Sequence, residues 1–352
     1  MHILFYTKYT NLAASSRLRS YQYFGLLQKN GCKITVLPLF NDRYLKEIYE
    51  KKSINKLNIL KQYTKRLYSL LFISKYDLVV IEKELFPYFP AFIESALNIL
   101  GIKYIVDYDD AIFHNYDKSN NVFIRLFLKN KIDIVMRSSA LTVVGNEYLQ
   151  LHAFAAKAKK TFLLPTVIDK NKYTKKDTYN DEKLIIGWIG SPTSLKYLNE
   201  IRNVLITLSA EFDFTIHIIG GKSSIGLPEF EKIIEWSETT EVDEIKKFDI
   251  GIMPLKDSDW ERGKCAYKLI QCMACGVAVI GSNIGANAKV IKDGYNGFLA
   301  ESEPDWYRKL KILLSNKSLR LEFGDKGYET VMNNYTLQSV FDKYYEELQS
   351  VN

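Results

Sequence analysis

The sequence predicts an α/β protein made of two Rossmann-like, doubly wound domains. Its 352 residues exceed the usual size of one domain, so two domains are the natural expectation. Short apolar runs alternate with helical stretches along the chain, and nearly continuous apolar strands are typical of parallel sheets that are covered on both faces. A polar run at 169–183 interrupts this alternation, which indicates a linker between two such domains.

The first domain is predicted over residues 1–168. It opens with an apolar strand at 2–6, a polar loop, a helix from about 17 to 30 and a second strand at 33–39, which together form a βαβ unit. Further apolar runs of strand length follow at 78–81, 104–106 and 141–144. These runs predict one parallel sheet for the first domain.

The second domain is predicted over residues 184–330, after the linker at 169–183. Its strands are expected at 184–190, 215–219, 250–253 and 277–280. Residues 331–352 are expected to form a C-terminal helix that packs back toward the first domain, with apolar residues at helical spacing over 337–348. Ligands of open α/β sheets bind at the carboxyl ends of the strands, so two such domains that face each other predict a ligand cleft between them.

Composition excludes several classes of protein. Apolar residues at 47% and charged residues at 25% are typical of a soluble globular protein. No apolar run reaches the about 18 residues that span a bilayer, and the first residues lack a signal-peptide pattern, so a cytoplasmic location is expected. Residues 1–165 carry 24 Lys and Arg against 13 Asp and Glu, a net +11, whereas the remainder carries 24 against 28, a net −4. The basic half predicts an anionic partner, and no nucleic-acid-binding module accompanies it.

The most informative segment is 260–280, which predicts a loop, a helix, a glycine stop and a buried strand. Arg262, Gly263 and Lys264 are expected at the start of this helix. There the free backbone N–H groups, the positive end of the helix dipole and two cations suit a diphosphate. Taken alone, the pattern is equally typical of a solvated helix end.

Together with the motifs that follow it, this segment resembles the C-terminal domain of the GT4-type (group 1) glycosyltransferases of GT-B fold. The shared pattern is a helix ending in M-A-x-G, a buried strand, a small-residue loop and D-G-x-N-G-x-L, found here at 273–276, 277–280, 281–285 and 293–299. Residues 164–169 and 189–191 resemble two further family elements. The resemblance implies transfer of a sugar, with retention, from a UDP- or GDP-type donor to a glycan or lipid-linked acceptor, in the synthesis of cell-surface polysaccharide or glycoconjugates and without a cofactor.

The resemblance also implies a donor site in the second domain. The two glutamates of the family's E-x7-E motif fall on Gly263 and Gln271, and Gln271 can still hydrogen-bond a ribose diol. The arginine of the family's G-R turn falls on Ser191. Arg262 and Lys264 are therefore expected to be catalytic cations that stabilise the leaving diphosphate. The residues expected to bind the donor are Gly190, Ser191, Lys196, Glu261, Gly263, Tyr267 and Gln271.

Carboxylates follow the strand at 104–106 in the first domain. Asp109 falls on the histidine of the family's V-x-V-H-D element, so it is expected to be catalytic by binding sugar hydroxyls or orienting the acceptor; a structural loop carboxylate is the alternative. The D-x-D spacing of 107–109 also matches a metal-binding signature of the other glycosyltransferase fold, but the second nucleotide-binding domain favours a metal-independent site and no metal is expected. The residues expected to bind the acceptor are Arg17, Arg19, Asp110 and His114, with helix capping as an equal alternative for the two arginines.

Three further alternatives stay open. The basic and apolar segment 56–75 predicts an amphipathic helix that either lies on an anionic membrane or covers the sheet. Membrane contact would suit a polyprenyl-linked acceptor at the inner face of the membrane. The fold would also suit a sugar-nucleotide epimerase or phosphorylase. Loss of both family glutamates would suit a non-catalytic subunit that binds a nucleotide-sugar.

Overall fold

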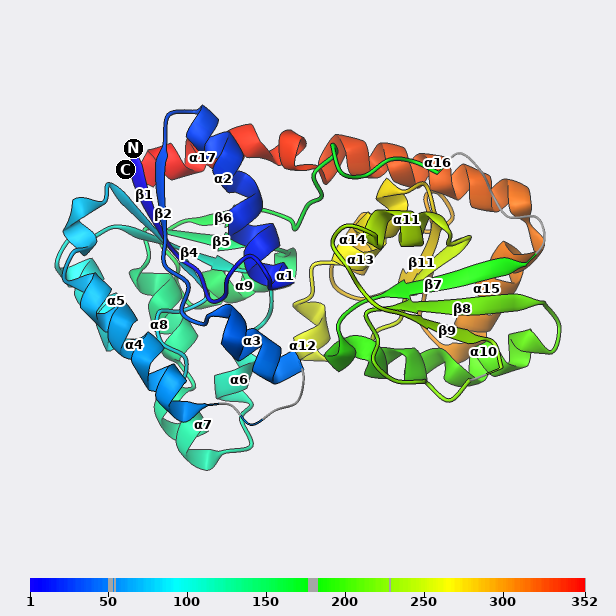
Figure 1. The fold of residues 1–352 in the computed structure, drawn as a ribbon, viewed down its shortest axis with the longest axis horizontal. Coiled ribbons are helices and arrows are strands. Elements are labelled where there is room, and N and C mark those ends of the chain that lie inside the picture. Colours follow the sequence, from blue (N-terminus) through cyan, green and yellow to red (C-terminus); the bar gives the residue numbers. More distant parts are fainter. Residues whose placement is uncertain (50–52, 54, 177–182, 228, 352) are drawn as a thin grey trace. The chain divides into compact units, whose positions relative to one another are not determined.

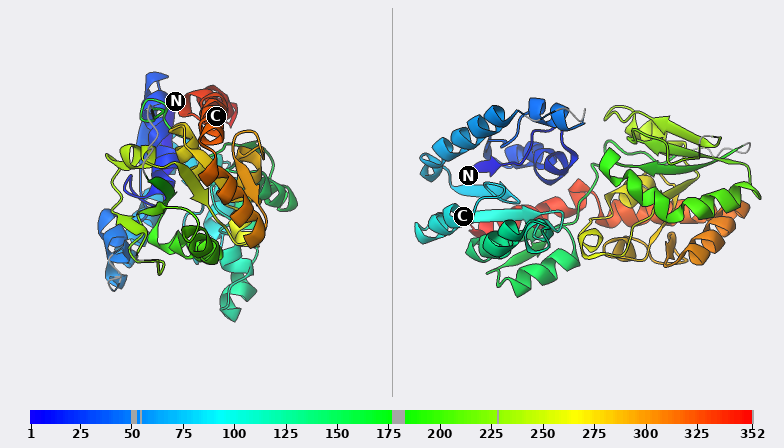
Figure 2. Two further views of the ribbon diagram at one scale, coloured as in Figure 1. Left: turned by 90° about the vertical axis from the view of Figure 1, so that its right-hand side faces the viewer. Right: turned by 90° about the horizontal axis from the view of Figure 1, so that it is seen from below.

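The computed structural model describes the chain apart from residues 50–52, 54, 177–182, 228 and 352 (Figure 1). The described residues form two compact units. Unit 1 comprises Met1–Thr166 and Val340–Asn352, and unit 2 comprises Val167–Ser339. Each unit contains one six-stranded parallel sheet with helices packed on both faces (Figure 2). The predicted doubly wound α/β architecture is therefore confirmed for each unit.

The sheet of unit 1 has the strand order β2-β1-β3-β4-β5-β6. Its strands are β1 (His2–Tyr6), β2 (Lys33–Val36), β3 (Leu78–Glu82), β4 (Tyr104–Tyr108), β5 (Leu141–Val144) and β6 (Thr161–Leu163). Every residue of β3, β4 and β5 is buried, as expected for central strands that are covered on both faces. Because the strands are parallel, their carboxyl ends share one edge of the sheet, where ligands of such sheets bind.

Helices connect these strands along the chain. They are α1 (Ala14–Ser16), η1 (Arg17–Tyr21), α2 (Gln22–Lys29), α3 (Asp42–Tyr49), α4 (Lys56–Leu70), η2 (Ile73–Lys75), α5 (Phe92–Ile99), α6 (His114–Asp117), α7 (Val122–Leu128), α8 (Lys131–Ser138) and α9 (Glu147–Ala155). Helix α17 (Leu337–Val351) begins in unit 2 and ends in unit 1. Three apolar residues of its predicted stripe, Phe341, Tyr344 and Leu348, are buried.

The sheet of unit 2 has the strand order β12-β11-β10-β7-β8-β9. Its strands are β7 (Leu184–Ile189), β8 (Phe214–Ile219), β9 (Glu231–Ile234), β10 (Ile250–Met253), β11 (Ala278–Ser282) and β12 (Phe298–Ala300). Its helices are η3 (Pro192–Ile201), α10 (Arg202–Ser209), α11 (Glu241–Lys246), α12 (Asp259–Arg262), α13 (Tyr267–Ala274), α14 (Asn287–Val290), α15 (Glu303–Ser315) and α16 (Lys317–Asn334). In the described part of the chain, no helix has both the length and the apolar character that a bilayer span requires.

The linker predicted at 169–183 lies partly outside the described residues. Its first part packs on unit 2. Tyr173 and Lys176 are buried, and the Lys176 Nζ donates to the Phe248 carbonyl oxygen at 2.5 Å. Although its composition is polar, this stretch is therefore not a solvated spacer up to Lys176. The Lys176 amine is buried because it donates to a buried carbonyl oxygen.

Candidate functional site

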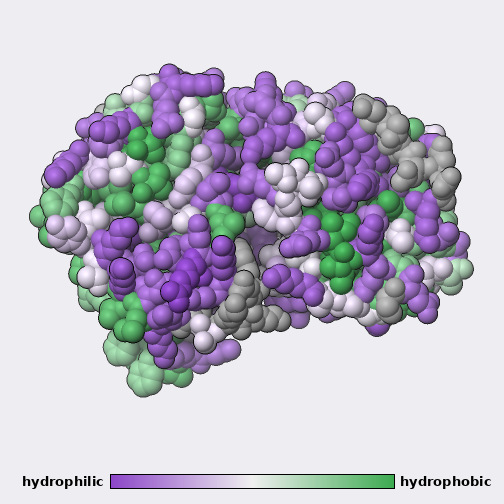
Figure 3. All heavy atoms as spheres, viewed as in Figure 1, coloured by the Kyte–Doolittle hydropathy of each residue, from purple (hydrophilic) through white to green (hydrophobic). Residues whose placement is uncertain are grey.

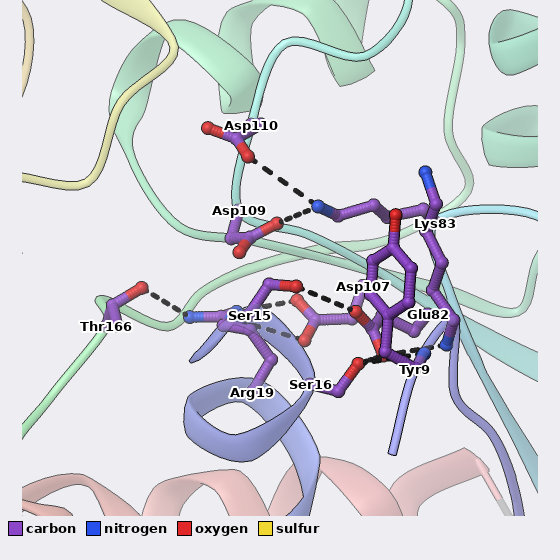
Figure 4. Close-up of polar contacts among 11 residues, drawn as sticks. Tyr9, Ser15, Ser16, Arg19, Glu82, Lys83, Asp107, Asp109, Asp110 and Thr166 are labelled. Atoms are coloured by element: carbon purple, nitrogen blue, oxygen red, sulfur yellow. Dashed lines mark hydrogen bonds and ion pairs between the residues drawn. The ribbon is translucent and has the colours of Figure 1, made fainter. Parts of the chain in front are cut away.

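Charged side chains gather at the carboxyl ends of β3 and β4 in unit 1 (Figure 4). Lys83 follows β3 directly and has a φ of 67°, a left-handed conformation that residues with a Cβ rarely adopt. Its side chain is buried and bonds to Asp109 at 2.8 Å and to Asp110 at 3.6 Å. Such backbone strain persists where the surroundings fix it, and it is concentrated at ligand sites.

The ion pair of Lys83 and Asp109 stays charged. Burial lowers the pKa of Lys83, but the attraction of Asp109, Asp110 and Glu82 outweighs this and raises that pKa above its usual value. Burial raises the pKa of Asp109, but Lys83 outweighs it and holds that pKa below the usual range. The side chains of Asp109 and Asp110 keep 13% and 33% of their surface exposed, so both carboxylates can still meet a ligand.

Arg19, predicted to bind the acceptor, lies instead inside unit 1 with 1% of its surface exposed. Its Nε and Nη2 donate to the two carboxylate oxygens of Asp107, at 3.0 and 2.6 Å, and Nη1 donates to the Leu164 carbonyl oxygen at 2.7 Å. All of these contacts are within the protein. Arg19 therefore joins η1 to the ends of β4 and β6, and an acceptor role does not fit its position.

Arg17 and His114 are also held by protein groups. Arg17 Nη1 donates to the carbonyl oxygens of Asn11 and Leu12, at 3.2 and 3.4 Å, so it closes the loop before α1, in line with the capping alternative. The two ring nitrogens of His114 lie 2.9 Å from an Asp117 carboxylate oxygen and 2.9 Å from the Tyr148 hydroxyl. The fourth predicted acceptor residue, Asp110, follows Asp109 directly and keeps 33% of its side-chain surface exposed.

The start of the helix in unit 2 differs from the prediction. The short helix α12 ends at Arg262, Gly263 caps it, and α13 begins only at Tyr267. Ala266 before it has a φ of 53°, which breaks the helix between the two segments. Arg262 and Lys264 thus lie at the end of α12 and in the connection, and neither lies at a helix N-terminus.

The cations of this connection differ in their surroundings. Arg262 donates to both carboxylate oxygens of Asp257, at 2.8 and 3.1 Å, which neutralises much of its charge. The Nζ atoms of Lys196 and Lys264 lie 5.2 and 5.8 Å from the ring centroid of Tyr197, so both lysines contact the same aromatic ring. Arg262 is thus held in a pair with Asp257, whereas Lys264 lies against Tyr197 and also interacts with Glu261.

Two polar residues of the predicted donor set are already engaged within unit 2. Glu261 is buried and accepts hydrogen bonds from the hydroxyls of Tyr197 and Ser258. Burial raises the pKa of Glu261, but these two hydrogen bonds, a backbone hydrogen bond and the charge of Lys264 together outweigh burial and lower that pKa. Gln271 is buried, and its Nε2 donates to the Tyr173 hydroxyl at 2.8 Å. For a ribose hydroxyl, Gln271 can offer its Oε1 as acceptor.

Lys268 is a residue that the sequence prediction missed. It is the one charged residue of α13, in the first turn of a helix whose other face is buried. Its Nζ lies 3.1 Å from the Ser194 Oγ and 4.2 Å from the Trp188 ring centroid. A Cβ on Gly190 would lie 2.5 Å from this Nζ, so Lys268 reaches the turn that follows β7. The sequence contained one signal for this residue, namely a single lysine in an otherwise uncharged helix.

The family-like motifs after α13 have structural roles. A Cβ on Gly285 would lie 2.7 Å from the Arg262 carbonyl oxygen, so the small-residue loop packs directly on the end of α12. In the D-G-x-N-G-x-L stretch, Asp293 accepts the Leu299 N–H at 2.8 Å and Asn296 accepts the Lys292 N–H at 2.8 Å. These bonds fix the turn before β12.

Among the described residues, no group of three or more His, Cys, Asp or Glu side chains is arranged to hold a metal.

Two doubly wound units define the GT-B class of fold, and solved structures of that class resemble the whole chain. Sucrose-phosphate synthase from Thermosynechococcus elongatus matches with a TM-score of 0.71 and 11% identity, over 100% of this chain and 99% of that one. Anabaena Alr3699/HepE, solved in complex with UDP, matches with a TM-score of 0.68 and 13% identity, over 99% and 100%. At these identities the likeness shows the fold, which is GT-B.

Sequence comparison relates the second unit to a known family. Residues 184–316 match the model of the family described as Glycosyl transferases group 1. N-acetyl-alpha-D-glucosaminyl L-malate synthase of Bacillus anthracis is 22% identical over 231 residues, which cover 60% of this chain and 59% of that protein. Three curated relatives match over 18%, 25% and 59% of their own length.

Proposed function

We propose that the protein is a glycosyltransferase that moves a sugar from a nucleotide-sugar to a glycan or lipid-linked acceptor, with retention and in the synthesis of cell-surface polysaccharide or glycoconjugates. One observation carries the proposal. Lys196 and Lys264 lie against Tyr197, and Lys268 lies over Trp188 beside the turn after β7, all within the residues that match the group 1 family model. Fixed cations at this edge of a sheet suit the charge of a diphosphate.

The proposed chemistry follows from the charge that develops during transfer. As the bond between the sugar and the β-phosphate breaks, negative charge grows on the leaving diphosphate, and fixed cations stabilise it. Lys264 and Lys268 supply this charge in unit 2, with a smaller part from Arg262. In unit 1, Asp109 binds the reacting sugar or orients the acceptor, because its carboxylate is ionised and fixed by Lys83. UDP is the first donor nucleotide to test, since a structural relative was solved with it.

Donor binding is expected to depend more on Lys264 than on Arg262. UDP at 100 times its Kd should raise the free energy of unfolding by about 2.7 kcal/mol, visible as a higher melting temperature. Lys264→Ala should weaken UDP binding about tenfold, and Arg262→Ala about twofold, because Asp257 already neutralises that guanidinium. Calorimetry on the full chain measures both affinities, with the exposed Lys256→Ala as control. If neither UDP nor GDP binds, the proposed donor class is wrong.

A membrane surface is the proposed partner of unit 1, at the cytoplasmic face. Large apolar residues of α7 are 61–74% exposed, namely Val122, Phe123, Leu126 and Phe127. Figure 3 shows hydrophobic side chains gathered at the lower end of unit 1, where α7 lies in Figure 1. On α4 and just after it, Leu57, Leu60, Leu67 and Leu71 are 54–77% exposed. An exposed apolar surface of this kind marks an interaction site.

The charge of these two segments selects an anionic surface. Residues 56–75 contain no Asp or Glu and four exposed lysines, while their fifth cation, Arg66, is buried. Residues 118–131 contain no Asp or Glu and three exposed Lys and Arg, while Lys131 is buried and paired with Glu84. Apolar side chains beside lysines are typical of helices that lie in the interface of an anionic bilayer. A lipid-linked acceptor would be presented at such a surface. This arrangement favours the membrane alternative for α4 over a helix that merely covers the sheet.

Membrane binding is expected to fall when the α7 aromatics are removed. Phe123→Ser with Phe127→Ser should weaken binding to vesicles of phosphatidylglycerol about tenfold or more, because each buried phenyl ring contributes about 1.5–3 kcal/mol. Vesicle flotation with the full chain measures the bound fraction. Phe154→Ser, which removes an exposed aromatic of α9 in the same unit, is the matched control. Equal flotation of the double variant and the control would contradict this surface, as would equal binding to neutral phosphatidylcholine.

A further inference from the structure

Lys268 has an unusual environment for a lysine at the edge of a protein core. Its Nζ lies over the Trp188 ring, 4.2 Å from the centroid, and 3.1 Å from the Ser194 Oγ. Neither contact supplies a negative charge. Among the residues that the structure describes, no carboxylate pairs with this amine. Lys268 is half-buried, and when its amine is charged the described residues provide no counter-ion for it.

The position of the amine indicates what the counter-ion is. A Cβ on Gly190 would come within 2.5 Å of Nζ, so the amine lies directly against the backbone turn after β7. This turn is at the carboxyl edge of the sheet, where ligands of doubly wound units bind. Ser191, the next residue, carries no charge. Lys268 therefore brings a cation from α13 to this turn.

Neighbouring groups keep this site positive. Lys264 lies in the connection before α13 and Lys196 on η3, and both lie against Tyr197. Glu261 on α12 accepts hydrogen bonds from Tyr197 and Ser258 and also attracts Lys264. A second cation close by makes the charged form of Lys268 harder to keep in the empty site and more favourable once an anion is bound.

We infer that Lys268 is a diphosphate ligand of the donor, and that donor binding protonates it. The inference rests on the proposed function, because it takes the anion to be the diphosphate of a sugar nucleotide bound by unit 2. Without the anion, burial and the charge of Lys264 favour the neutral form of the amine above about pH 7. The bound diphosphate supplies the missing counter-charge, and the amine takes one proton from the solvent as it becomes ammonium.

The expected pH dependence follows from the lysine's surroundings. Burial first, and then repulsion by Lys264, lower the pKa of Lys268 to about 7, while Cys272 on the same helix acts weakly in the opposite sense. The bound anion raises this pKa, so the complex holds more protons than the free protein and its ligand. Uptake should be about 0.9 proton per donor at pH 8, and about 0.1 at pH 6, where most of the free protein already carries the charge.

Calorimetric titration in buffers of different ionisation enthalpy measures this uptake directly. UDP-glucose and GDP-mannose are suitable probes, because both phosphates of a sugar nucleotide are esterified and do not titrate in this range. With the full chain, the tighter of the two should take up about 0.9 proton at pH 8. Lys268→Arg should bind within about threefold of the wild type and take up no proton, because a guanidinium is always charged.

Lys268→Met should bind about tenfold more weakly at pH 6 and take up no proton, and Lys256→Met is the matched control with unchanged uptake. The thermal unfolding of each variant is recorded, and the arginine variant keeps the test valid if the methionine variant does not fold. Proton uptake by Lys268→Arg equal to that of the wild type overturns the inference, and the wild-type binding in the same experiment leaves the proposed donor class standing. Absence of binding by either sugar nucleotide contradicts both.

Discussion

Replacing Arg19 with methionine is expected to destabilise the protein by about 3–5 kcal/mol, because it leaves the Asp107 carboxylate buried without its charge partner. Arg19 and Asp107 expose 1% and 8% of their side chains and are joined by two hydrogen bonds. Methionine fills a similar volume, so the loss comes mainly from the charge and the hydrogen bonds. Equilibrium unfolding in urea, followed by circular dichroism, measures the change in the free energy of unfolding.

The neighbouring arginine provides a matched control. Arg17→Met removes a cation whose bonds go to loop carbonyl oxygens at the surface, and should change stability by about 0.5 kcal/mol or less. A second variant, Arg19→Met with Asp107→Leu, removes both charges and should recover part of the loss. Equal destabilisation by Arg19→Met and Arg17→Met would show that the buried pair does not hold this edge of the sheet together.

Replacing Asp109 with asparagine is expected to lower kcat about 100-fold, within the range found for groups that act on the reacting atoms. The amide keeps the shape of the side chain but loses the negative charge that Lys83 fixes at 2.8 Å. The pKa of Asp109 is lowered in the folded protein, so its charged form is lost only when the pH falls below the ordinary aspartate value of about 4. Activity that depends on this carboxylate should therefore stay constant between about pH 5 and 8.

The control for Asp109 is Asp342→Asn, an exposed carboxylate on α17 in the same unit. It should leave both kcat and stability unchanged. Asp109→Asn should act on kcat and leave the Kd for the donor nucleotide within about threefold, because the proposed nucleotide site consists of residues of unit 2. If the Asp109 variant keeps the wild-type kcat, Asp109 is a structural loop carboxylate and has no role in catalysis.

The strands that the sequence revealed are those with an uninterrupted apolar run. β3 and β7 could be predicted from such runs because these strands are covered on both faces. The strands β6, β9 and β12 were missed because each has only three or four residues and lies at an edge of its sheet, half exposed. Their pairing depends on the neighbouring strand, which a local pattern does not contain.

The site was less predictable than the fold because its contacts join distant parts of the chain. Arg19 reads as a surface cation in a polar loop, and only the carboxylate of Asp107, 88 positions away, explains its burial. Lys268 meets Ser194 across 74 positions. The break in the helix before α13 was equally hidden, because Ala266 is a good helix former that adopts a left-handed conformation here.

The proposed transferase activity is tested by the release of UDP or GDP from a panel of sugar nucleotides by the purified full chain. A detergent extract that contains lipid-linked saccharides serves as the source of acceptor, and the product nucleotide and labelled sugar are measured together. We expect sugar transfer with one donor, about 100-fold slower in Asp109→Asn and with weaker donor binding in Lys268→Met. Tight donor binding without any transfer, or release that needs free phosphate and no acceptor, would contradict it.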